Sequence, residues 1–421
     1  MAKGLVSVGR TLQIPWGAWS GSAEELSVRF PDSWDVQVFP MRDAEDITGS
    51  AAVERAVRNP FGTPPIRNIA TGKKNAVLVV EDVSRPTRCG PICEVILNEL
   101  NQAGIPDSRI TVIGAVGAHR PMRRADYVSK VGEKVVERVN IENHHPYENL
   151  VQLGESKLGT PIHLNRTYHE AGVKISVSTV IPHPLAGFGG GAKIILPGIC
   201  GIETLAANHR AGMKGVGIGI GFITDLRKDI EDVCSRVGLD FSVNIVATSR
   251  RGIAGIYAGH YIEAHRQAVD RARQVYHTET LKLDPKNRFD VGFFNLFPED
   301  TELSQALKGV NSFMGSQSML KPKSAIVFMT AATEGRGYHS LLAETGARLY
   351  ENWGENPIFK AVMSTRPFYV FSPNVTRADV YHFFPGYTVF HRNFDDLTRS
   401  LGETVGSNPK AAIFPSSIQL F

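Results

Sequence analysis

The chain has 421 residues, of which 42% are hydrophobic and 21% charged, and its formal net charge is +4. This length exceeds one typical hydrophobic core, so two domains are expected, and the composition is that of an ordinary soluble globular protein. The small net charge and the lack of basic runs interleaved with aromatic residues argue against nucleic-acid binding, and no apolar stretch approaches the roughly 18 residues of a membrane span.

The N-terminus and the cysteines indicate the compartment. Residues 1–5 do not open a long apolar core of the kind that a secretory signal carries. Four cysteines are too few for a disulfide framework in so long a chain, and the pair Cys89 and Cys93 lacks the second pair that a metal site of this kind needs. We therefore expect a cytoplasmic protein with buried or free thiols.

Short apolar runs alternate with amphipathic helical patterns from residue 76 onward, whereas the first seventy residues show little periodicity. The expected strands are 76–80, 110–116, 173–181 and 243–247, and the expected helices are 91–103, 122–132, 202–212 and 261–276. Strands that alternate with helices predict an α/β fold with a parallel sheet.

A second α/β series follows a polar, proline-bearing segment at 281–288, which we interpret as a linker. Its expected strands are 291–296, 325–329 and 368–371. The sequence therefore predicts two α/β domains, 1–283 and 284–421, with an active-site cleft between them and with the last residues able to return to the first domain.

Polar clusters follow the ends of the expected strands. They occupy 81–88, 117–121, 183–193 and 297–300, and the last leads to Gln305 and Lys308. Because ligands of open α/β sheets bind at the carboxyl ends of the strands, these clusters are expected to form one site. Purely structural roles stay open for each: Asp82 as a cap, Arg85 as its partner, and Gln305 and Lys308 as exposed positions of a helix.

The glycine run Gly189, Gly190 and Gly191 leads directly to Ala192 and Lys193. Glycines let a bulky ligand approach the backbone, and successive N–H groups form a cradle for anions. A lysine at that place supplies either a point charge for phosphate or a nucleophilic amine. The spacing is not that of a P-loop, and a flexible turn with a solvated lysine is the alternative.

Charged and titratable residues complete the candidate site. Arg85 and Lys308 are candidate binders of a carboxylate, since a guanidinium fork matches it bidentately and an ammonium adds charge. His119 and His183 are candidate acid/base groups, because imidazole titrates near neutral pH. His209, sixteen residues after Lys193, is a candidate metal ligand within a helical pattern.

These residues resemble the fingerprint of the nickel-dependent lactate racemase family, whose members carry a nickel-pincer nucleotide. The matching motifs span about half the chain, and they read Asp82-Val-Ser-Arg85-Pro86, Gly117-Ala-His119-Arg120, Pro182-His183-Pro-Leu-Ala-Gly-Phe-Gly-Gly-Gly-Ala-Lys193, Asn208-His209 and Gln305-Ala-Leu-Lys308. The ten- and sixteen-residue spacings that end and begin at Lys193 are the most specific of these features.

The resemblance implies a cofactor and a reaction. Lys193 would tether the cofactor, a pyridinium-3,5-bisthiocarboxylic acid mononucleotide nickel complex, and His209 would be the protein ligand of the nickel. His119 and His183 would act as acid and base. Reversible hydride transfer through a 2-keto acid would then racemise or epimerise a 2-hydroxy acid, and cofactor-biosynthesis proteins would be partners.

The resemblance also implies which residues bind the substrate, but three positions in or beside the matching segments differ from the residues expected in the family. Arg85 and Lys308 would bind the substrate carboxylate, with Asp82 and Gln305 as supporting polar groups. Ser304 stands where lactate racemases are expected to have an aromatic residue, and Pro184-Leu185 replaces a bulky aromatic pair. We therefore expect a 2-hydroxy acid larger than lactate.

Three other functions stay open from the residues. A zinc-dependent enzyme would use His119, His183 and His209, although no H-E-x-x-H motif is present. A Schiff-base enzyme would use Lys193 as its amine. A noncatalytic nucleotide-binding protein would leave Lys193 unmodified.

Overall fold

The computed structural model describes residues 7–8, 11–19, 25–210, 215–222, 224–339, 363 and 365–421. The fold is α/β, as expected, and divides into two compact units. The middle unit is Ala44–Val275, and the terminal unit combines Met1–Asp43 with Tyr276–Phe421. The observed boundary at Tyr276 lies close to the expected one, but residues 1–43 belong with the C-terminal part and not with the first domain. The end of the expected helix 202–212 lies outside the described residues.

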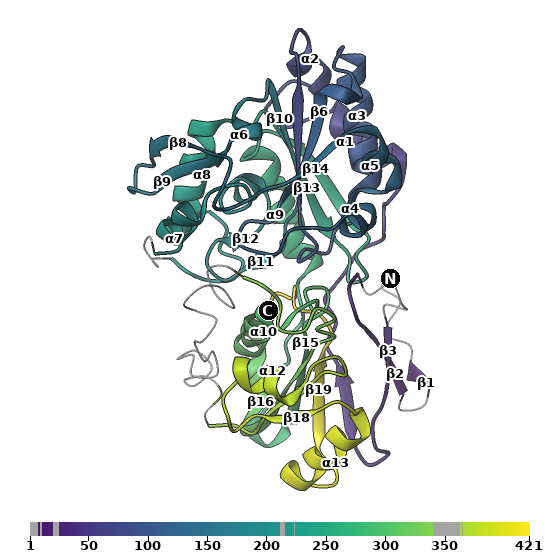
Figure 1. The fold of residues 1–421 in the computed structure, drawn as a ribbon. Helices are drawn as coiled ribbons and strands as arrows, with labels where there is room; N and C mark the ends of the chain where they lie inside the picture. Colours follow the sequence, from purple (N-terminus) through teal and green to yellow (C-terminus); the bar gives the residue numbers. More distant parts are fainter. Residues whose placement is uncertain are drawn as a thin grey trace. The chain divides into compact units, whose positions relative to one another are not determined.

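A six-stranded sheet with the order β14-β13-β10-β5-β6-β7 forms the centre of the middle unit (Figure 1). Its strands are β5 (Ala76–Glu81), β6 (Ile110–Ala115), β7 (Asn140–Asn143), β10 (Val173–Thr179), β13 (Phe241–Ala247) and β14 (Ile253–Gly259). All neighbouring pairs are parallel except β13 and β14, which form an antiparallel pair at one edge. Every residue of β5 and β13 is buried, which explains their continuous apolar sequences.

The order of these strands creates a switch point between β5 and β10. The chain runs from β5 to β6 and β7 on one side, and later returns to β10 on the other side of β5. At such a point the connections leave the sheet in opposite directions and open a crevice at the carboxyl ends of the strands. The segments that begin at Asp82 and at Val180 both start there.

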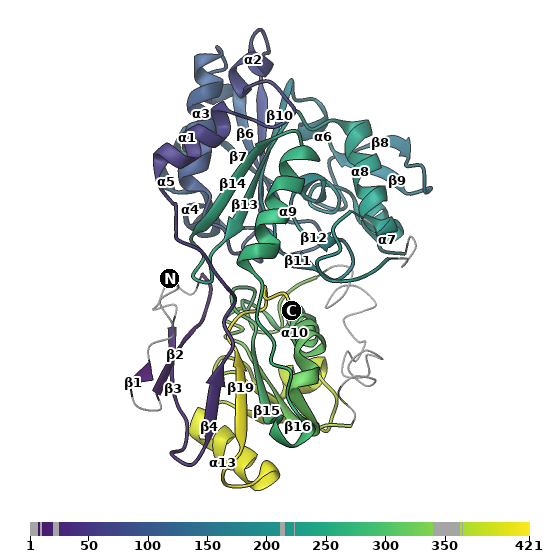
Figure 2. The same ribbon diagram turned by 180° about the vertical axis from the view of Figure 1, so that it is seen from behind.

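Helices and short elements surround this sheet. The helices are α1 (Ser50–Arg58), α2 (Ile66–Ala70), α3 (Gly90–Gln102), α4 (Arg124–Val131), α5 (Glu133–Arg138), α6 (Arg166–His169), α7 (Ile202–Arg210), α8 (Asp225–Val237) and α9 (Glu263–Val275). Helix α9 packs on β13 and β14 (Figure 2). Two short antiparallel pairs, β8 (Leu150–Glu155) with β9 (Pro161–Asn165) and β11 (Pro182–His183) with β12 (Gly187–Phe188), and the 3-10 helices η1 (Asp107–Arg109) and η2 (Gly191–Ile194) complete the unit.

The terminal unit has its own six-stranded sheet, with the order β18-β17-β16-β15-β19-β4 and only parallel pairs. The strands are β4 (Asp35–Val38), β15 (Phe289–Asn295), β16 (Leu320–Met329), β17 (Phe368–Phe371), β18 (Val389–His391) and β19 (Lys410–Phe414). Because β4 pairs with β19, the N-terminal segment completes this sheet, which is why residues 1–43 depart from the expected domain. The last strand also stays in this unit.

The two faces of this second sheet bury separate cores. Along β15, Phe293 belongs to one cluster and Phe294 to the other, as the alternation of a strand requires. The first cluster is covered by the antiparallel strands β2 (Thr11–Pro15) and β3 (Glu25–Arg29) and by α13 (Phe394–Val405). The second is covered by α10 (Leu307–Ser316) and α12 (Arg377–Phe383). Short elements β1 (Ser7–Val8), η3 (Pro285–Asn287), η4 (Leu303–Gln305) and η5 (Gln317–Met319) complete the unit.

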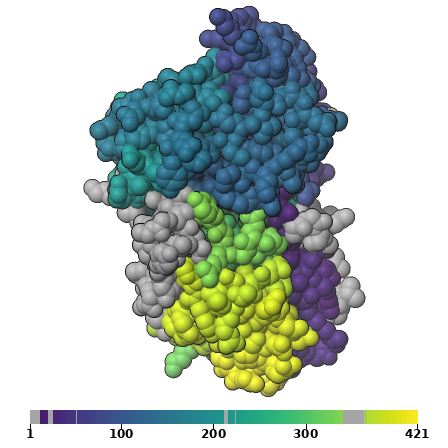
Figure 3. Space-filling view, in the orientation of Figure 1, coloured from purple at the N-terminus to yellow at the C-terminus, as the bar shows by residue number. Residues whose placement is uncertain are grey.

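The surface in Figure 3 is blue and teal over the middle unit and green and yellow over the C-terminal part of the terminal unit. Within the described ranges, no helix is both long and apolar enough to cross a membrane. All four cysteines are buried free thiols, and Cys89 precedes helix α3 directly.

Candidate active site

The buried Asp82 and the partly buried His119 form a pair just past the ends of β5 and β6. The His119 Nδ1 atom lies 2.6 Å from Asp82 Oδ2, and Asp82 Oδ1 accepts hydrogen bonds from Ser84 N at 3.0 Å and Ser84 Oγ at 2.5 Å. Burial raises the pKa of Asp82, but the charge and hydrogen bond of His119 and the charge of Arg85 outweigh burial and hold it well below its usual range. An ionised carboxylate only accepts, so His119 carries a proton on Nδ1, and in the neutral form of His119 the nitrogen that can act as a base is Nε2.

Arg85 lies on the same loop, and its Nη1 donates to Ser84 Oγ at 3.3 Å. Ser84 Oγ therefore lies between Arg85 and Asp82, so the carboxylate orients His119 directly and Arg85 through the serine. The Arg85 guanidinium is partly exposed, whereas Asp82 and Ser84 are buried. Arg85 can therefore present its charge to a ligand at the edge of the sheet.

A buried ion pair lies beneath this loop. The Nζ atom of Lys130, a fully buried side chain, lies 3.2 Å from Glu81 Oε1 and donates to the Arg85 carbonyl at 3.1 Å. Glu81 in turn accepts a hydrogen bond from Thr179 N at 2.8 Å. Since Thr179 is the last residue of β10, this pair ties the ends of β5 and β10 together at the switch point.

His183, the last residue of β11, is held by the backbone of the turn that leads to β12. Its Nδ1 atom accepts hydrogen bonds from Leu185 N at 3.2 Å and from Ala186 N at 3.1 Å. An Nδ1 atom that accepts two N–H groups carries no proton, so the proton of neutral His183 lies on Nε2. His183 thus presents an N–H donor at Nε2, whereas His119 carries at Nδ1 the proton that it shares with Asp82.

The glycine run and Lys193 follow this turn. Gly190 and Gly191 have φ values of +75° and +57°, in the region that favours glycine. A Cβ on Gly190 would lie 2.7 Å from Val180 Cγ2, and one on Gly191 would lie 2.9 Å from His265 Cγ. Both the backbone conformation and the packing therefore require glycine there, and the backbone leads into η2 with Lys193.

His209 lies near the end of α7, with its Nδ1 atom 2.8 Å from the carbonyl of Leu205. Because a carbonyl only accepts, Nδ1 carries the proton and Nε2 keeps its lone pair. Burial and the charge of Lys193 lower the pKa of His209, while the Leu205 hydrogen bond raises it. The two side chains are therefore close enough to interact electrostatically.

Gln305 and Lys308 belong to the terminal unit, in η4 and α10. Lys308 pairs with the buried Glu299, and the Gln305 Nε2 donates to Glu302 Oε1 at 3.1 Å. Ser304 Oγ also donates to Glu302. Their proposed roles with a substrate stay predictions.

The structure brings most of the predicted residues together and adds others that were not predicted. Parallel pairing places the segments of Asp82, His119 and His183 at the carboxyl ends of adjacent strands β6, β5 and β10. Sequence reasoning missed Arg227, His265, Asn244 and Lys130, which support the loops from behind. No motif pointed to them, since they lie in ordinary helix and strand patterns.

The donor set of His209 and Lys193 fits a tethered nickel cofactor. An imidazole Nε2 with a free lone pair is a suitable ligand for Ni(II), and a lysine amine is close to it. Among the described residues, no group of three or more His, Cys, Asp or Glu side chains is arranged to hold a metal. His119, His183 and His209 therefore do not form the zinc site considered from the sequence.

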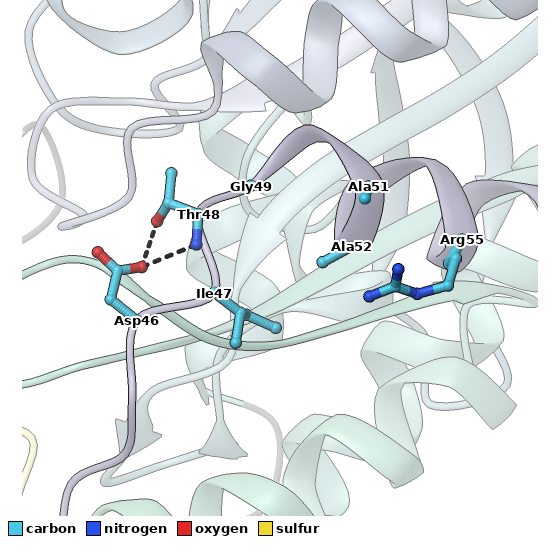
Figure 4. Close-up of a pocket in the computed structure, with 7 residues that line it drawn as sticks. All are labelled: Asp46, Ile47, Thr48, Gly49, Ala51, Ala52 and Arg55. Atoms are coloured by element: carbon cyan, nitrogen blue, oxygen red, sulfur yellow. Dashed lines mark hydrogen bonds between the residues drawn. The ribbon is translucent and has the colours of Figure 1, made fainter.

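A separate groove opens at the start of α1, outside all of these groups (Figure 4). It is lined by Asp46, Ile47, Thr48, Gly49, Ala51, Ala52 and Arg55. The Asp46 carboxylate accepts hydrogen bonds from Thr48 N at 3.0 Å and Ile253 N at 2.9 Å, so it stabilises the local turn.

Comparisons with known proteins show similarity to lactate racemases. The family described as lactate racemase N-terminal domain matches residues 22–220. A lactate racemase from Lactiplantibacillus plantarum is 28% identical over 298 residues, which cover 69% of this chain and 68% of that protein. One from Thermoanaerobacterium thermosaccharolyticum is 26% identical over 290 residues, covering 68% of this chain and 66% of that protein. The matched region thus spans about two thirds of each relative.

Solved structures share the fold. The lactate racemase apoprotein of Thermoanaerobacterium thermosaccharolyticum superposes with a TM-score of 0.74 at 21% identity, covering 98% of this chain and 99% of that one. A protein from Thermotoga maritima superposes with a TM-score of 0.66 at 16% identity, covering 90% and 99%.

The chain is thus similar in sequence and fold to lactate racemases, which are isomerases. The match to the lactate racemase N-terminal domain covers residues 22–220, slightly less than half of the chain.

Proposed function

We propose that this protein is a racemase or epimerase of a 2-hydroxy acid that works with a nickel-pincer nucleotide tethered to Lys193. The observation that carries the proposal is the opposite proton placement on His119 and His183 at one edge of the sheet. Free cysteines favour the cytoplasm as its compartment.

Lys193 and His209 would hold the cofactor, one as the tether and the other as the nickel ligand. When bound, the cofactor supplies a reversible hydride acceptor, which the amino acids themselves lack. Hydride chemistry suits this substrate class, because removing a proton from the carbon beside an ionised carboxylate would build a second negative charge next to the first.

The protein residues would bind the substrate and move its hydroxyl proton. Arg85 would hold the carboxylate, since its guanidinium is partly exposed and fixed by Ser84. His119 Nε2 would accept the hydroxyl proton as the 2-keto acid forms. His119, once protonated, would return that proton when the alcohol is formed again. The Nε2–H of His183 would donate a hydrogen bond to the same oxygen from the other face.

The two named relatives act on lactate, and three positions suggest a different substrate for this chain. Ser304, Pro184 and Leu185 replace the aromatic residues expected in lactate racemases. Pro184 and Leu185 are partly exposed directly after His183, so their size affects the space beside an acid/base group. We propose a 2-hydroxy acid with a side chain larger than methyl.

The test begins with protein made in a host that has the cofactor-biosynthesis proteins. Peptide mass spectrometry should find the cofactor mass on Lys193, nickel should accompany it, and the protein should racemise a 2-hydroxy acid. Lys193→Ala should lose the adduct and the activity, while Lys157→Ala, whose side chain is 80% exposed, should keep both.

Three outcomes would contradict the proposal. Full activity in Lys193→Ala would remove the tether. Borohydride trapping of a carbonyl substrate on Lys193, without nickel dependence, would indicate a Schiff-base enzyme. A ligand-binding protein that turns over no 2-hydroxy acid would indicate a noncatalytic function.

A further inference from the structure

Three buried side chains, those of Arg227, Asn244 and His265, form hydrogen bonds to the backbone of the glycine loop 186–191. Arg227 of α8 directs its guanidinium at three loop carbonyls: Nε lies 3.4 Å from Ala186 O, Nη1 lies 3.4 Å from Gly190 O, and Nη2 donates to Phe188 O. Arg227 is among the largest fully buried side chains of the described chain. All of these hydrogen bonds go to a single loop.

His265 of α9 and Asn244 of β13 hold the rest of the loop. His265 Nε2 lies 2.7 Å from Gly189 O and must donate, because a carbonyl only accepts. Asn244 Oδ1 accepts from Gly191 N at 2.8 Å. The carbonyls of residues 186, 188, 189 and 190 and one N–H are therefore fixed by side chains from three separate elements, which we call the loop clamp (Arg227, His265 and Asn244).

Burying an arginine for this purpose is costly. A guanidinium removed from water loses its hydration, which only well-placed acceptors can replace. Burial lowers the pKa of Arg227 to about 10, which still leaves it charged at neutral pH. Burial and the charge of Arg227 lower the pKa of His265 to about 3, so His265 is neutral. The clamp therefore consists of one cation and two neutral groups.

The loop needs such support because glycine has little conformational preference of its own. Gly187, Gly190 and Gly191 all have positive φ values, and three such residues would sample many conformations in an unsupported loop. The Gly190 carbonyl held by Arg227 also accepts from Lys193 N at 3.2 Å. The clamp thus reaches the backbone of Lys193 through one shared oxygen.

We propose that Arg227, His265 and Asn244 are positioning residues that fix the glycine loop and so place Lys193 for attachment of the cofactor. The part concerning attachment rests on the proposed function, whereas the part concerning the loop does not. None of the three side chains needs to touch the cofactor, because they act through the backbone of the loop.

The first experiment measures amide hydrogen exchange of the peptide that contains residues 183–193, in protein without cofactor. Arg227→Met and His265→Phe should each raise the exchange rate at least about tenfold, since local opening controls exchange. His265→Gln keeps a donor and should recover most of the protection, and Arg227→Lys, with charge but no fork, should recover part. Arg138→Met is the control, because Arg138 holds Asp107 and Asn101 far along the chain from the loop.

The second experiment measures the fraction of Lys193 that carries the adduct when each variant is made with the biosynthetic proteins. Arg227→Met and His265→Phe should lose about tenfold or more of the adduct, and His265→Gln should restore it. The proposal would be overturned if folded His265→Phe and Arg227→Met had the same amide exchange rate and the same adduct fraction as the parent. It would also be overturned if His265→Phe and His265→Gln had equal adduct fractions. If Arg227→Met does not fold, the comparison of His265→Phe with His265→Gln tests the proposal by itself.

The two experiments separate the two proposals. A parent protein with no adduct on Lys193 would refute the proposed function, and the exchange data would still show whether the clamp fixes the loop. Normal loading of the parent together with unchanged exchange and loading in the variants would refute the clamp alone.

Discussion

His119 Nδ1 and Asp82 Oδ2 lie 2.6 Å apart, and this single contact determines which nitrogen of His119 is available as a base. The carboxylate accepts the Nδ1 proton, so in neutral His119 the nitrogen without a proton is Nε2. His183 shows the opposite arrangement, because its Nδ1 accepts two backbone N–H groups. In the proposed reaction, the hydroxyl proton would pass to His119 Nε2, while the N–H of His183 would donate a hydrogen bond to the same oxygen.

Asp82→Asn should therefore impair the reaction without affecting the tether. An asparagine amide can donate to His119 Nδ1 and so favours the proton on Nε2, which removes the base. Loss of the correct tautomer in comparable histidine pairs reduces kcat on the order of 10²- to 10⁴-fold. Steady-state kinetics and the adduct fraction should be measured together, with Asp107→Asn as a control for loss of an ion-paired carboxylate. Unchanged kcat in Asp82→Asn would mean that His119 is not the base.

The same contact predicts a pH dependence of stability. The pKa of Asp82 is depressed in the folded protein, so its stabilising effect is fully present above the unfolded value of about 3.9 and is lost as pH falls below it. The difference in the free energy of unfolding between the parent and Asp82→Asn should be largest near pH 7 and should shrink below pH about 4. Urea unfolding at several pH values measures it, and a difference that grows toward acid pH would contradict the sign.

The sequence could predict the edge of the sheet at which the polar groups gather. Buried strands such as β5 have continuous apolar runs, and parallel pairing places whatever follows them on one side. The residues after β5, β6 and β10 were therefore recognisable before the fold was known. Motif spacing added the roles expected of Lys193 and His209.

The loop clamp and the domain boundary could not be predicted in this way. Arg227 and His265 occupy positions in amphipathic helices where a charged or polar residue usually faces solvent, and only the packing of α8 and α9 shows that both are buried. Strand β4 pairs with β19, more than 370 residues later, and no local pattern reveals such a partner. Both features depend on contacts between segments far apart in the sequence.

The Lys130–Glu81 pair gives a prediction on stability. Lys130→Met should lower the free energy of unfolding by about 3–5 kcal/mol, because the Glu81 carboxylate would remain buried without its cation. Adding Glu81→Gln to that variant should recover part of the loss. Lys134→Met removes an exposed lysine whose ion pair is long, at 4.0 Å, and should change stability by less than about 1 kcal/mol. Equal destabilisation by Lys130→Met and Lys134→Met in urea unfolding would show that the buried Lys130–Glu81 pair contributes no more to stability than an exposed ion pair.

Arg85→Lys tests how the substrate carboxylate is held. A bidentate charge-assisted pair contributes roughly 1.5–3 kcal/mol, and lysine keeps the charge but not the fork. We expect kcat/KM to fall roughly 10- to 100-fold for every 2-hydroxy acid, with the adduct on Lys193 unchanged. Arg88→Lys, three residues along and exposed, is the matched control. A loss of kcat/KM for one substrate alone would show that Arg85 binds the side chain of that substrate and not the carboxylate that all 2-hydroxy acids share.

Substrate preference should follow the three positions that depart from lactate racemases: Pro184, Leu185 and Ser304. Ser304 is held by a hydrogen bond to the buried Glu302, so a small polar group occupies a position where the relatives are expected to have an aromatic ring. We expect at least one acid with a carboxymethyl, benzyl or polyhydroxyl side chain to exceed lactate in kcat/KM, measured by chiral analysis of both enantiomers. Ser304→Tyr should shift the preference toward lactate, because the ring restores the missing bulk, whereas Ser304→Ala removes only the hydroxyl and should leave the order of substrates unchanged. Lactate as clearly the best substrate of the parent would show that these three positions do not shift the preference away from lactate.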